Sequence, residues 1–400
     1  KYLDAKNPGE TDMEGLYEQE RCKWLAHPCA EVCPKHAISM VNGHSYIDQE
    51  KCVHCGKCKS VCPYDAISKK ERPCSRACGV KAIGSDEFGR AKIDNEKCVS
   101  CGMCMVSCPF GAISDKSQIY QLARSLKEGN EIIAEIAPAF VGQFGSMEPK
   151  DVHAALETLG FSEVYEVALG ADIGAVSEAR HYAEKVATGE LPFLLTSCCP
   201  SWSMLAKKYF PTMIDNISQE LTPMVATARS IKQEHPNAKV VFIGPCAAKK
   251  LEASRRSVRS DVDFVITFEE LVGMFDAKGI DMGEKENAHS MHDATAAGRG
   301  YAVAGGVAGA IEECLKAYYP DVTPKIIHAE GLAECKKTLA LAKAGKINGC
   351  LIEGMGCPGG CIAGAGTNLP LNKAAAKVKW FKSVSSKQLP PKELAEIELK

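Results

Sequence analysis

The chain lacks long apolar runs, a strong net charge and a leader-like start. No apolar stretch approaches the roughly 18 residues that a membrane-spanning helix needs. The formal net charge is −2 over 400 residues, so nothing attracts the chain electrostatically to nucleic acid or an anionic membrane. The first residues, KYLDAKNPGE, are polar and do not resemble a secretory signal. These absences exclude nucleic-acid binding and membrane insertion, and the length predicts two or three domains.

Cysteine is abundant instead. The chain has 21 cysteines, an odd number, and 13 of them lie between Cys22 and Cys108. A chain of this size does not depend on disulfides, and a disulfide scaffold would spread its cysteines evenly. Crowding with CxxC spacing predicts metal ligation in a reducing compartment, and therefore a cytoplasmic protein.

Two segments of the first 120 residues repeat with a period of about 45 residues. Each carries PCxxxC, an Ala-Ile pair and a C-x2-C-x2-C-x3-C-P run. In such runs three thiolates bind one [4Fe–4S] cluster and the cysteine before proline ligates the other cluster, whereas a zinc ribbon needs two CxxC pairs. The spacing predicts two clusters with crossed ligands, one on Cys52, Cys55, Cys58 and Cys108, the other on Cys98, Cys101, Cys104 and Cys62.

Five cysteines of this region remain: Cys22, Cys29, Cys33, Cys74 and Cys78. Four of them suffice for a third [4Fe–4S] cluster, and two ligand sets stay open. The symmetry of the repeat favours the last four. The run RCKWLAHPCAEVCP resembles a different ferredoxin-like pattern, which favours the first three with one of the other two. Alternatively, the five are remnants of duplicated modules.

From about residue 130, short apolar runs alternate with amphipathic stretches, which predicts an α/β domain with largely parallel sheets. We expect an extension at 1–45, an α+β ferredoxin-like domain at 46–118 and the α/β domain at 119–400. Three predicted strands run into the loops TSCCPSW, GPCAAKK and EGMGCPGGC. Open α/β sheets present ligands at the carboxyl ends of their strands. The loops there supply Cys198, Cys199, Cys246, Cys357 and Cys361.

Adjacent cysteines rarely serve one tetrahedral site, because neighbouring side chains diverge. We therefore expect Cys198 and Cys199 to have different roles. Lys249, three residues after Cys246, is able to donate to an anionic ligand, although an ordinary solvated lysine would fit the same spacing. Three further cysteines lie in helical or strand-like runs and are expected to be small buried hydrophobic residues: Cys314, Cys335 and Cys350.

At the three loops the chain resembles the [FeFe]-hydrogenases. The family signatures TSCCPxW, xPCxxKxxE and ExMxCPGGCxxGGG correspond here to TSCCPSW, GPCAAKKLE and EGMGCPGGCIAGAG. The likeness extends from about Cys52 to Pro370 and includes IAPA and VAGGVAGAI. It implies a ferredoxin-fused enzyme similar to those of clostridial-type anaerobes, with a catalytic domain at 119–400 that interconverts H2 with protons and electrons. The implied cofactor, the H-cluster, joins a [4Fe–4S] subcluster to a diiron unit with CO, cyanide and azadithiolate.

The resemblance also implies a role for each residue. Cys199, Cys246 and Cys357 ligate the subcluster, and Cys361 bridges it to the diiron unit. Cys198 passes protons to and from the amine of the azadithiolate. Beyond these cysteines, the resemblance implies a proton route through Glu178 and Ser218, and a cyanide ligand held by Lys249. The pocket is expected to include Ala137, Pro138, Gly244, Pro245 and Met355.

The chain departs from the family pattern at three single positions and at the end of the last loop, which reads GAGTN and not GGGQP. The second glutamate of the family's proton route falls at His181, which titrates nearer neutral pH. The usual methionine before Pro-Cys is Gly244, which is expected to leave room or water near the cluster. The usual glutamine after Ser/Thr-Pro is Met224, which removes a polar neighbour of an iron-bound CO. No ligand is lost, so a divergent branch with shifted rate or bias is expected.

The implied partners are H2, protons, ferredoxin or a similar carrier, and maturation proteins for the diiron unit, and a monomer is expected. One rival is an iron–sulfur assembly or electron-carrier protein of the same fold without diiron chemistry. Those relatives lack the full cysteine set, notably the TSCCP pair. A hydrogen sensor is the other rival, but about thirty residues follow Pro370, too few for a signalling module. The lysine-rich segment there is expected to be a docked or solvated helix.

Overall fold

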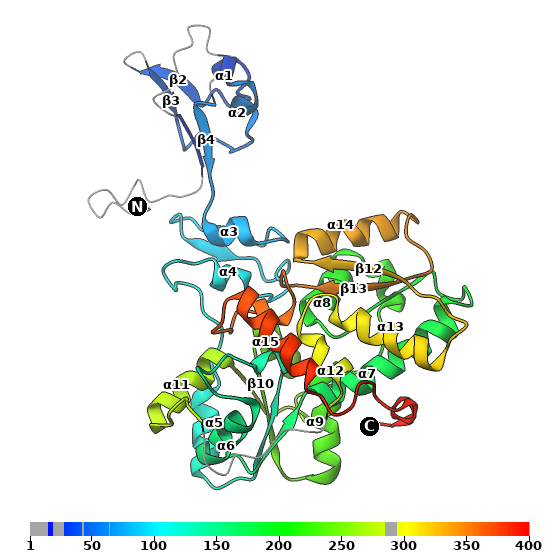
Figure 1. Cartoon of the computed structure of the whole chain (residues 1–400). Helices are drawn as coiled ribbons and strands as arrows, with labels where there is room; N and C mark the ends of the chain where they lie inside the picture. Colours follow the sequence, from blue (N-terminus) through cyan, green and yellow to red (C-terminus); the bar gives the residue numbers. More distant parts are fainter. Residues whose placement is uncertain (1–14, 19–27, 42–43, 64, 285–293, 400) are drawn as a thin grey trace. The chain divides into compact units, whose positions relative to one another are not determined.

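The computed structural model describes residues 15–18, 28–41, 44–63, 65–284 and 294–399 (Figure 1). They form two compact units that divide between Asp94 and Asn95. The expected ferredoxin-like segment 46–118 is thus split, with its second cysteine run in the larger unit. That run is tied there by Lys208 Nζ, which donates to the Asn95 and Cys98 carbonyls at 2.9 Å each.

The first unit consists of short antiparallel strand pairs with one-turn helices. The strand pairs are β1 (Gly15–Glu18) with β4 (Ile67–Lys70), β2 (Ile38–Val41) with β3 (His44–Ile47), and β5 (Ile83–Ser85) with β6 (Ala91–Ile93). The helices are α1 (Pro28–Glu31), α2 (Lys57–Val61) and α3 (Pro73–Ala77). Ile38, Ile47 and Ile67 form a small core with several of the cysteines. This arrangement confirms the predicted α+β class.

The larger unit holds two parallel sheets. One has the order β11 (Phe264–Thr267), β10 (Lys239–Gly244), β7 (Ile132–Ile136), β8 (Glu163–Glu166). The other has the order β12 (Lys325–Glu330), β13 (Cys350–Met355), β9 (Phe193–Leu195). All five pairings are parallel, which confirms the α/β prediction. The strand β12 was not predicted, because it is an edge strand with mostly exposed or half-buried residues.

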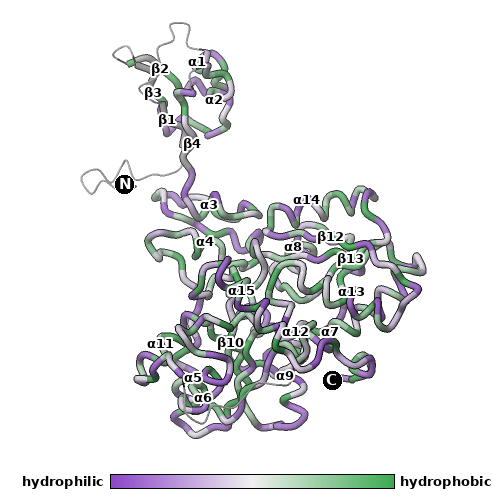
Figure 2. Tube along the Cα trace, viewed as in Figure 1, coloured by the Kyte–Doolittle hydropathy of each residue, from purple (hydrophilic) through white to green (hydrophobic). Residues whose placement is uncertain are grey.

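Helices cover both sheets and separate two apolar cores, and the most hydrophobic chain segments coincide with the buried strands (Figure 2). In chain order the longer helices are α5 (Ile119–Lys127), α6 (Pro149–Leu159), α7 (Ala168–His181), α8 (Pro200–Tyr209), α9 (Pro223–Glu234), α11 (Phe268–Lys278), α13 (Gly306–Tyr318), α14 (Leu332–Lys343) and α15 (Leu371–Ser383). The short ones are α4 (Met103–Val106), α10 (Ala247–Ala253) and α12 (Ala296–Arg299). None of the described helices is long and apolar enough to cross a membrane.

The helix predicted after Pro370 is docked, not solvated. Along α15 the residues Ala374, Val378 and Phe381 are buried, at the i, i+4, i+7 spacing of one helix face. The Phe381 ring also lies 4.0 Å from the guanidinium of Arg299, which pairs with Glu166 inside the protein. The C-terminal helix therefore belongs to the core of the larger unit.

Two glycines let the elements that carry the site approach closely. A Cβ at Gly354, on β13, would lie 1.9 Å from the Trp202 ring, so only glycine admits that indole against the strand. The indole N–H donates to the Thr196 carbonyl at 3.1 Å and fixes the turn between β9 and α8. A Cβ at Gly170 would meet the Pro223 carbonyl oxygen at 2.2 Å, which brings α7 against the start of α9. Both contacts position the loop of Cys198 and Cys199.

Candidate functional site

The first unit brings four cysteines together without any residue of the larger unit. Cys33, Cys52, Cys55 and Cys58 line one small cavity of about 290 Å³. Burial, together with the neighbouring thiols, raises the pKa of Cys58. Cys33 thus lies beside three of the predicted ligands, whereas the predicted fourth ligand, Cys108, belongs to the larger unit and stays a prediction. The β2–β3 hairpin brings Cys33 there, because it folds the chain back between Cys33 and Cys52.

The same turn follows four cysteines of the front end: Cys33, Cys62, Cys78 and Cys108. In each turn the backbone N–H four residues further on donates to the sulfur, at 3.2 to 3.3 Å. The residue before each donor has a positive φ, between 45° and 59°: His36, Asp65, Lys81 and Gly111. Cys33 and Cys78 therefore share their local geometry with the predicted ligands Cys62 and Cys108. Whether they are ligands or remnants stays open.

These sites fit clusters better than single ions. Among the described residues, no three His, Cys, Asp or Glu side chains converge as a single metal ion requires. A [4Fe–4S] cluster holds its thiolates further apart than one zinc ion does. Cys29 belongs to the small core of the first unit and Cys62 packs against that core, whereas Cys22 lies outside the described residues. The ligands of any further cluster there stay a prediction.

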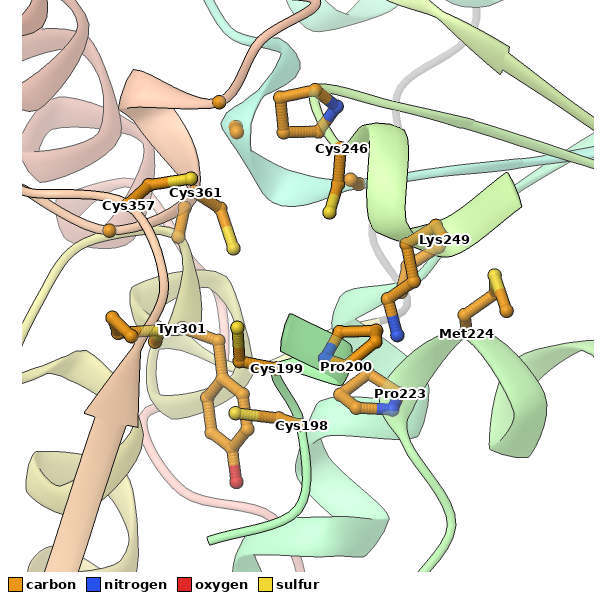
Figure 3. Close-up of a pocket in the computed structure, with 18 of the residues that line it drawn as sticks. Cys198, Cys199, Pro200, Pro223, Met224, Cys246, Lys249, Tyr301, Cys357 and Cys361 are labelled. Atoms are coloured by element: carbon orange, nitrogen blue, oxygen red, sulfur yellow. The ribbon is translucent and has the colours of Figure 1, made fainter. Parts of the chain in front are cut away.

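A site of buried cysteines lies in the larger unit, lined by loops at the carboxyl ends of strands from both sheets (Figure 3). The space between these loops, part of it open to solvent, is about 820 Å³. Its walls come from the segments that follow β7, β9, β10 and β13. The three cysteine loops predicted to meet at strand ends do meet there.

Six cysteines line this cavity, among them the four implied subcluster ligands: Cys199, Cys246, Cys357 and Cys361. Burial raises the pKa of Cys246 to about 11 and that of Cys361 to about 12, and it raises the pKa of Cys357 well above its usual range. Buried thiolates this close repel each other, so the set loses its protons readily only when iron supplies positive charge. The donors fit a [4Fe–4S] subcluster.

Cys198 faces another way. Its sulfur lies beside the Tyr301 ring, whereas that of Cys199 points toward Cys361 (Figure 3). The divergence arises because Cys199 caps α8, with Pro200 as the first residue of that helix. Burial and the carboxylate of Glu178 raise the pKa of Cys198 well above its usual range. Cys198 is therefore a protonated thiol beside a carboxylate, which suits proton transfer better than ligation.

Glu178 is 3% exposed and sits on α7 behind the thiol. It accepts hydrogen bonds from the Ser197 N–H at 3.3 Å, from the Ser197 hydroxyl at 3.4 Å and from the Ser218 side chain. Burial raises its pKa to about 7, although these hydrogen bonds oppose the rise. A carboxyl with that pKa is able both to give and to take a proton near neutral pH.

Lys249 is buried, contrary to the solvated alternative, and its amine points into the cavity (Figure 3). Burial opposes its charged form, but the Glu252 carboxylate at 2.7 Å outweighs that and raises the pKa of Lys249. Nearby, burial raises the pKa of Glu135 well above its usual range, so that carboxyl stays neutral. Lys249 thus presents a fixed positive charge to whatever fills the cavity.

The remaining wall is apolar: Ala137, Pro138, Met224, Phe242, Pro245 and Met355. The expectation that Gly244 leaves room or water is wrong. A Cβ there would lie 2.4 Å from the Phe242 ring, which already fills the space and lines the cavity. Residues two apart on a strand share a face, so the ring of Phe242 covers Gly244.

Sequence reasoning missed Tyr301 and Ser197, and it did not place the predicted cluster ligand Cys101 at this cavity. Tyr301 lines the cavity, and its buried hydroxyl has no hydrogen-bond partner among the described residues. Ser197 bonds Glu178, and Cys101 of the second cysteine run lines the cavity. Only Cys101 carried a signal, as a predicted cluster ligand. His181, by contrast, does not line this cavity.

The pKa of Glu178 predicts a pH-dependent stability. Since its folded-state pKa is raised from 4.5 to about 7, its contribution to stability is complete below pH 4.5 and is lost as pH rises toward 7. The amide in Glu178→Gln does not ionise, so the variant does not lose this stability as pH rises. The free energy of unfolding is measured by anaerobic urea unfolding at pH 5 and pH 8. We expect the value of the variant minus that of the wild type to be larger at pH 8 than at pH 5. The pKa of Asp172 is also raised, to about 6, but Asp172 is present in both proteins, so its pH-dependent contribution cancels in the difference. An equal difference at both pH values would contradict the prediction.

The fold and this cavity define a parallel α/β protein with a buried four-thiol site beside an iron–sulfur front end. Comparison with family models agrees. Residues 130–365, more than half of the chain, match the C-terminal domain of the iron-only hydrogenase large subunit. The chain belongs to this family. Residues 22–72 match the LdpA Fe–S cluster-binding domain and residues 91–114 a 4Fe–4S binding domain.

Relatives with established names fall into two groups. The chain is 28% identical to the periplasmic [Fe] hydrogenase large subunit of Nitratidesulfovibrio vulgaris over 80% of this chain and 85% of that protein. It is 28% identical to iron hydrogenase 1 of Clostridium pasteurianum over 86% of this chain and 69% of that protein. The cytosolic Fe–S cluster assembly factor NAR1 of Meyerozyma guilliermondii is also 28% identical, but over 36% of this chain and 29% of that protein.

Solved structures show the same fold. A variant of apo [FeFe]-hydrogenase HydA1 from Chlamydomonas reinhardtii superposes with a TM-score of 0.54 at 21% identity, over 70% of this chain and 93% of that chain. The fold prediction is thus confirmed, and the chain is an iron–sulfur protein of the hydrogenase type.

Proposed function

We propose that this protein is an [FeFe]-hydrogenase that catalyses 2 H+ + 2 e− ⇌ H2. One observation carries the proposal: a protonated thiol, Cys198, stands beside a buried carboxyl, Glu178, at the edge of a four-thiol cavity. Electron storage alone requires the four thiols but not this pair. The cavity also extends past the thiols to an apolar wall with one buried cation, Lys249, which suits a diiron unit with small anionic ligands.

When bound, the diiron unit would supply heterolytic cleavage of H2 and accept its electrons. Cys199, Cys246, Cys357 and Cys361 would hold the linked [4Fe–4S] subcluster. Lys249, fixed by Glu252, would hold an anionic ligand of the unit through a charge-assisted hydrogen bond. The protein's own residues then move one proton at a time, from Cys198 Sγ to the Glu178 carboxylate in one direction and back in the other.

Electrons would travel through the second cysteine run. The loop of Cys101 packs on the loops of the site, since a Cβ at Gly102 would lie 2.5 Å from Ala365 and 3.3 Å from Ala247. A cluster held there would adjoin the subcluster. The set of Cys33, Cys52, Cys55 and Cys58 would hold another cluster and exchange electrons with ferredoxin or a similar carrier. A reducing, cytoplasmic environment suits these thiol sets.

An iron–sulfur assembly role is the alternative, favoured by the NAR1-type relatives. It would use the four-thiol site but would give no purpose to Cys198 or to the hydrogen bonds that hold Glu178. The apolar wall beyond the thiols would likewise have no occupant.

Infrared spectroscopy distinguishes the hydrogenase from an assembly or electron-carrier protein. Full-length protein is matured anaerobically with the diiron unit, and spectra are taken with and without H2. Sharp bands from iron-bound CO and cyanide that shift under H2 are expected. A known hydrogenase matured in parallel is the control. No bands in this protein, despite full [4Fe–4S] loading and a normal control, would leave it an electron carrier or assembly protein.

A further inference from the structure

The buried carboxyl of Glu178 needs a connection to solvent if it relays protons. His181, one helical turn further along α7, stands where the family has its second proton-route glutamate, so the outer route is expected to differ here or to run elsewhere. The ring of His181 is partly buried and makes no hydrogen bond or ion pair with any residue that the structure describes. It does not line the pocket that Glu220 lines. The structure therefore gives no support for an outlet through His181.

A second pocket is lined by residues next to Glu178 and Ser218 in the sequence. It has about 560 Å³ of space, part of it open to solvent, between Ser177 and Arg180 of α7, Gln219 and Glu220 of the loop before α9, and Ile397 near the C-terminus. Gln219 is exposed, so the pocket reaches the surface. Arg180 and Glu220 are the charged side chains among its described lining residues, and no ion pair joins them.

Two serines contact both Glu178 and the backbone of Glu220, which lines this pocket. The Ser218 hydroxyl bonds the Glu178 carboxylate and accepts from the Glu220 N–H at 3.3 Å. The Ser197 hydroxyl donates to the Glu220 carbonyl at 3.0 Å and lies 3.4 Å from the Glu178 carboxylate. Residue 220 is thus held on both sides by the partners of Glu178.

The side chain of Glu220 is suited to carry a proton. It is partly exposed in the pocket, and its carboxylate makes no hydrogen bond or ion pair with a described residue. It is near enough that its charge raises the pKa of Glu178. A carboxylate that no partner neutralises, between solvent and a buried carboxyl, is able to take a proton from water and pass it inward.

We propose that Glu220 is the outer proton carrier of this protein and connects Glu178 to solvent through the Ser218 hydroxyl. One proton enters from water onto the Glu220 carboxylate, moves through Ser218 to Glu178, and leaves Glu220 ionised again. Hydrogen oxidation runs the same steps in reverse. The role in catalysis rests on the proposed hydrogenase function, but the proton connection itself does not.

The test measures proton exchange at Glu178 in full-length protein that carries [4Fe–4S] clusters and no diiron unit. After rapid mixing with D2O, infrared spectra follow conversion of the Glu178 carboxyl from COOH to COOD, assigned by its loss in Glu178→Gln. Glu220→Gln, which has nearly the same volume, should slow exchange at least about tenfold, and Glu220→Asp should restore most of it. His181→Gln and the surface control Glu184→Gln should exchange at the wild-type rate.

Equal exchange in Glu220→Gln and the wild type, or slow exchange in His181→Gln instead, would overturn the proposal. The same variants are then matured and assayed for H2 turnover. If exchange depends on Glu220 but the matured protein does not turn over H2, the proton connection stands and the proposed hydrogenase function is rejected. Turnover that is unaffected in Glu220→Gln would reject Glu220 as the carrier used in catalysis.

Discussion

Cys198→Ala is expected to lower H2 turnover by about 10²- to 10⁴-fold while the infrared bands of iron-bound CO and cyanide persist. The substitution removes the thiol beside Glu178 but none of the four thiols that face one another across the cavity. Binding of the cofactor and loss of proton transfer should therefore separate in one variant. Turnover and the infrared spectrum are measured on the same anaerobically matured sample.

Cys314→Ala provides the matched control. Cys314 is fully buried on α13 and does not line the cavity, so the same atoms are removed from a core position. It should cost some stability but leave turnover near the wild-type level. If Cys198→Ala keeps turnover within a few-fold of Cys314→Ala, protons reach the cofactor without this thiol and the assigned role fails.

Much of the site was predictable from sequence because strand ends are predictable. Apolar runs followed by cysteine loops place Cys199, Cys246 and Cys357 at the carboxyl ends of parallel strands, and the structure brings them together there. The burial of Cys314, Cys335 and Cys350 followed from helical and strand patterns in the same way. Local sequence pattern sufficed for these cysteines because each lies on a helix or strand or directly beside one.

The errors concern residues whose neighbours are set by the path of the chain. The repeat showed two cysteine runs but not that the β2–β3 hairpin returns Cys33 to the run that follows it. Gly244 suggested space, yet the ring two residues earlier fills it. No sequence motif marked Glu220 as a candidate site residue. Its place beside Glu178 depends on the packing of α7 against α9, which Gly170 permits and which no local pattern reports.

The last of the four cavity thiols, Cys361, should be needed for the diiron unit altogether. In Cys361→Ser we expect no CO or cyanide bands after maturation and no H2 turnover, because a serine oxygen is a poor ligand for iron–sulfur centres. The volume and the local turn are retained, so the fold should survive. The spectroscopic signals of the clusters in the front end should also remain, since their cysteines are unchanged.

Cys350→Ser, on the strand that leads into the same loop, is the matched control. The Cys350 thiol donates to the Asn348 carbonyl at 3.3 Å, a bond that a serine hydroxyl is able to replace, and it does not face the cavity. It should keep bands and turnover. Bands that persist in Cys361→Ser would show that another group joins the subcluster to the diiron unit. If both variants lose the CO and cyanide bands, the cause is a loss of stability at β13 and not the loss of an iron ligand. Together with Cys198→Ala, which should keep the bands and lose the rate, the comparison assigns the binding of the cofactor and the movement of the proton to different sulfur atoms of one cavity.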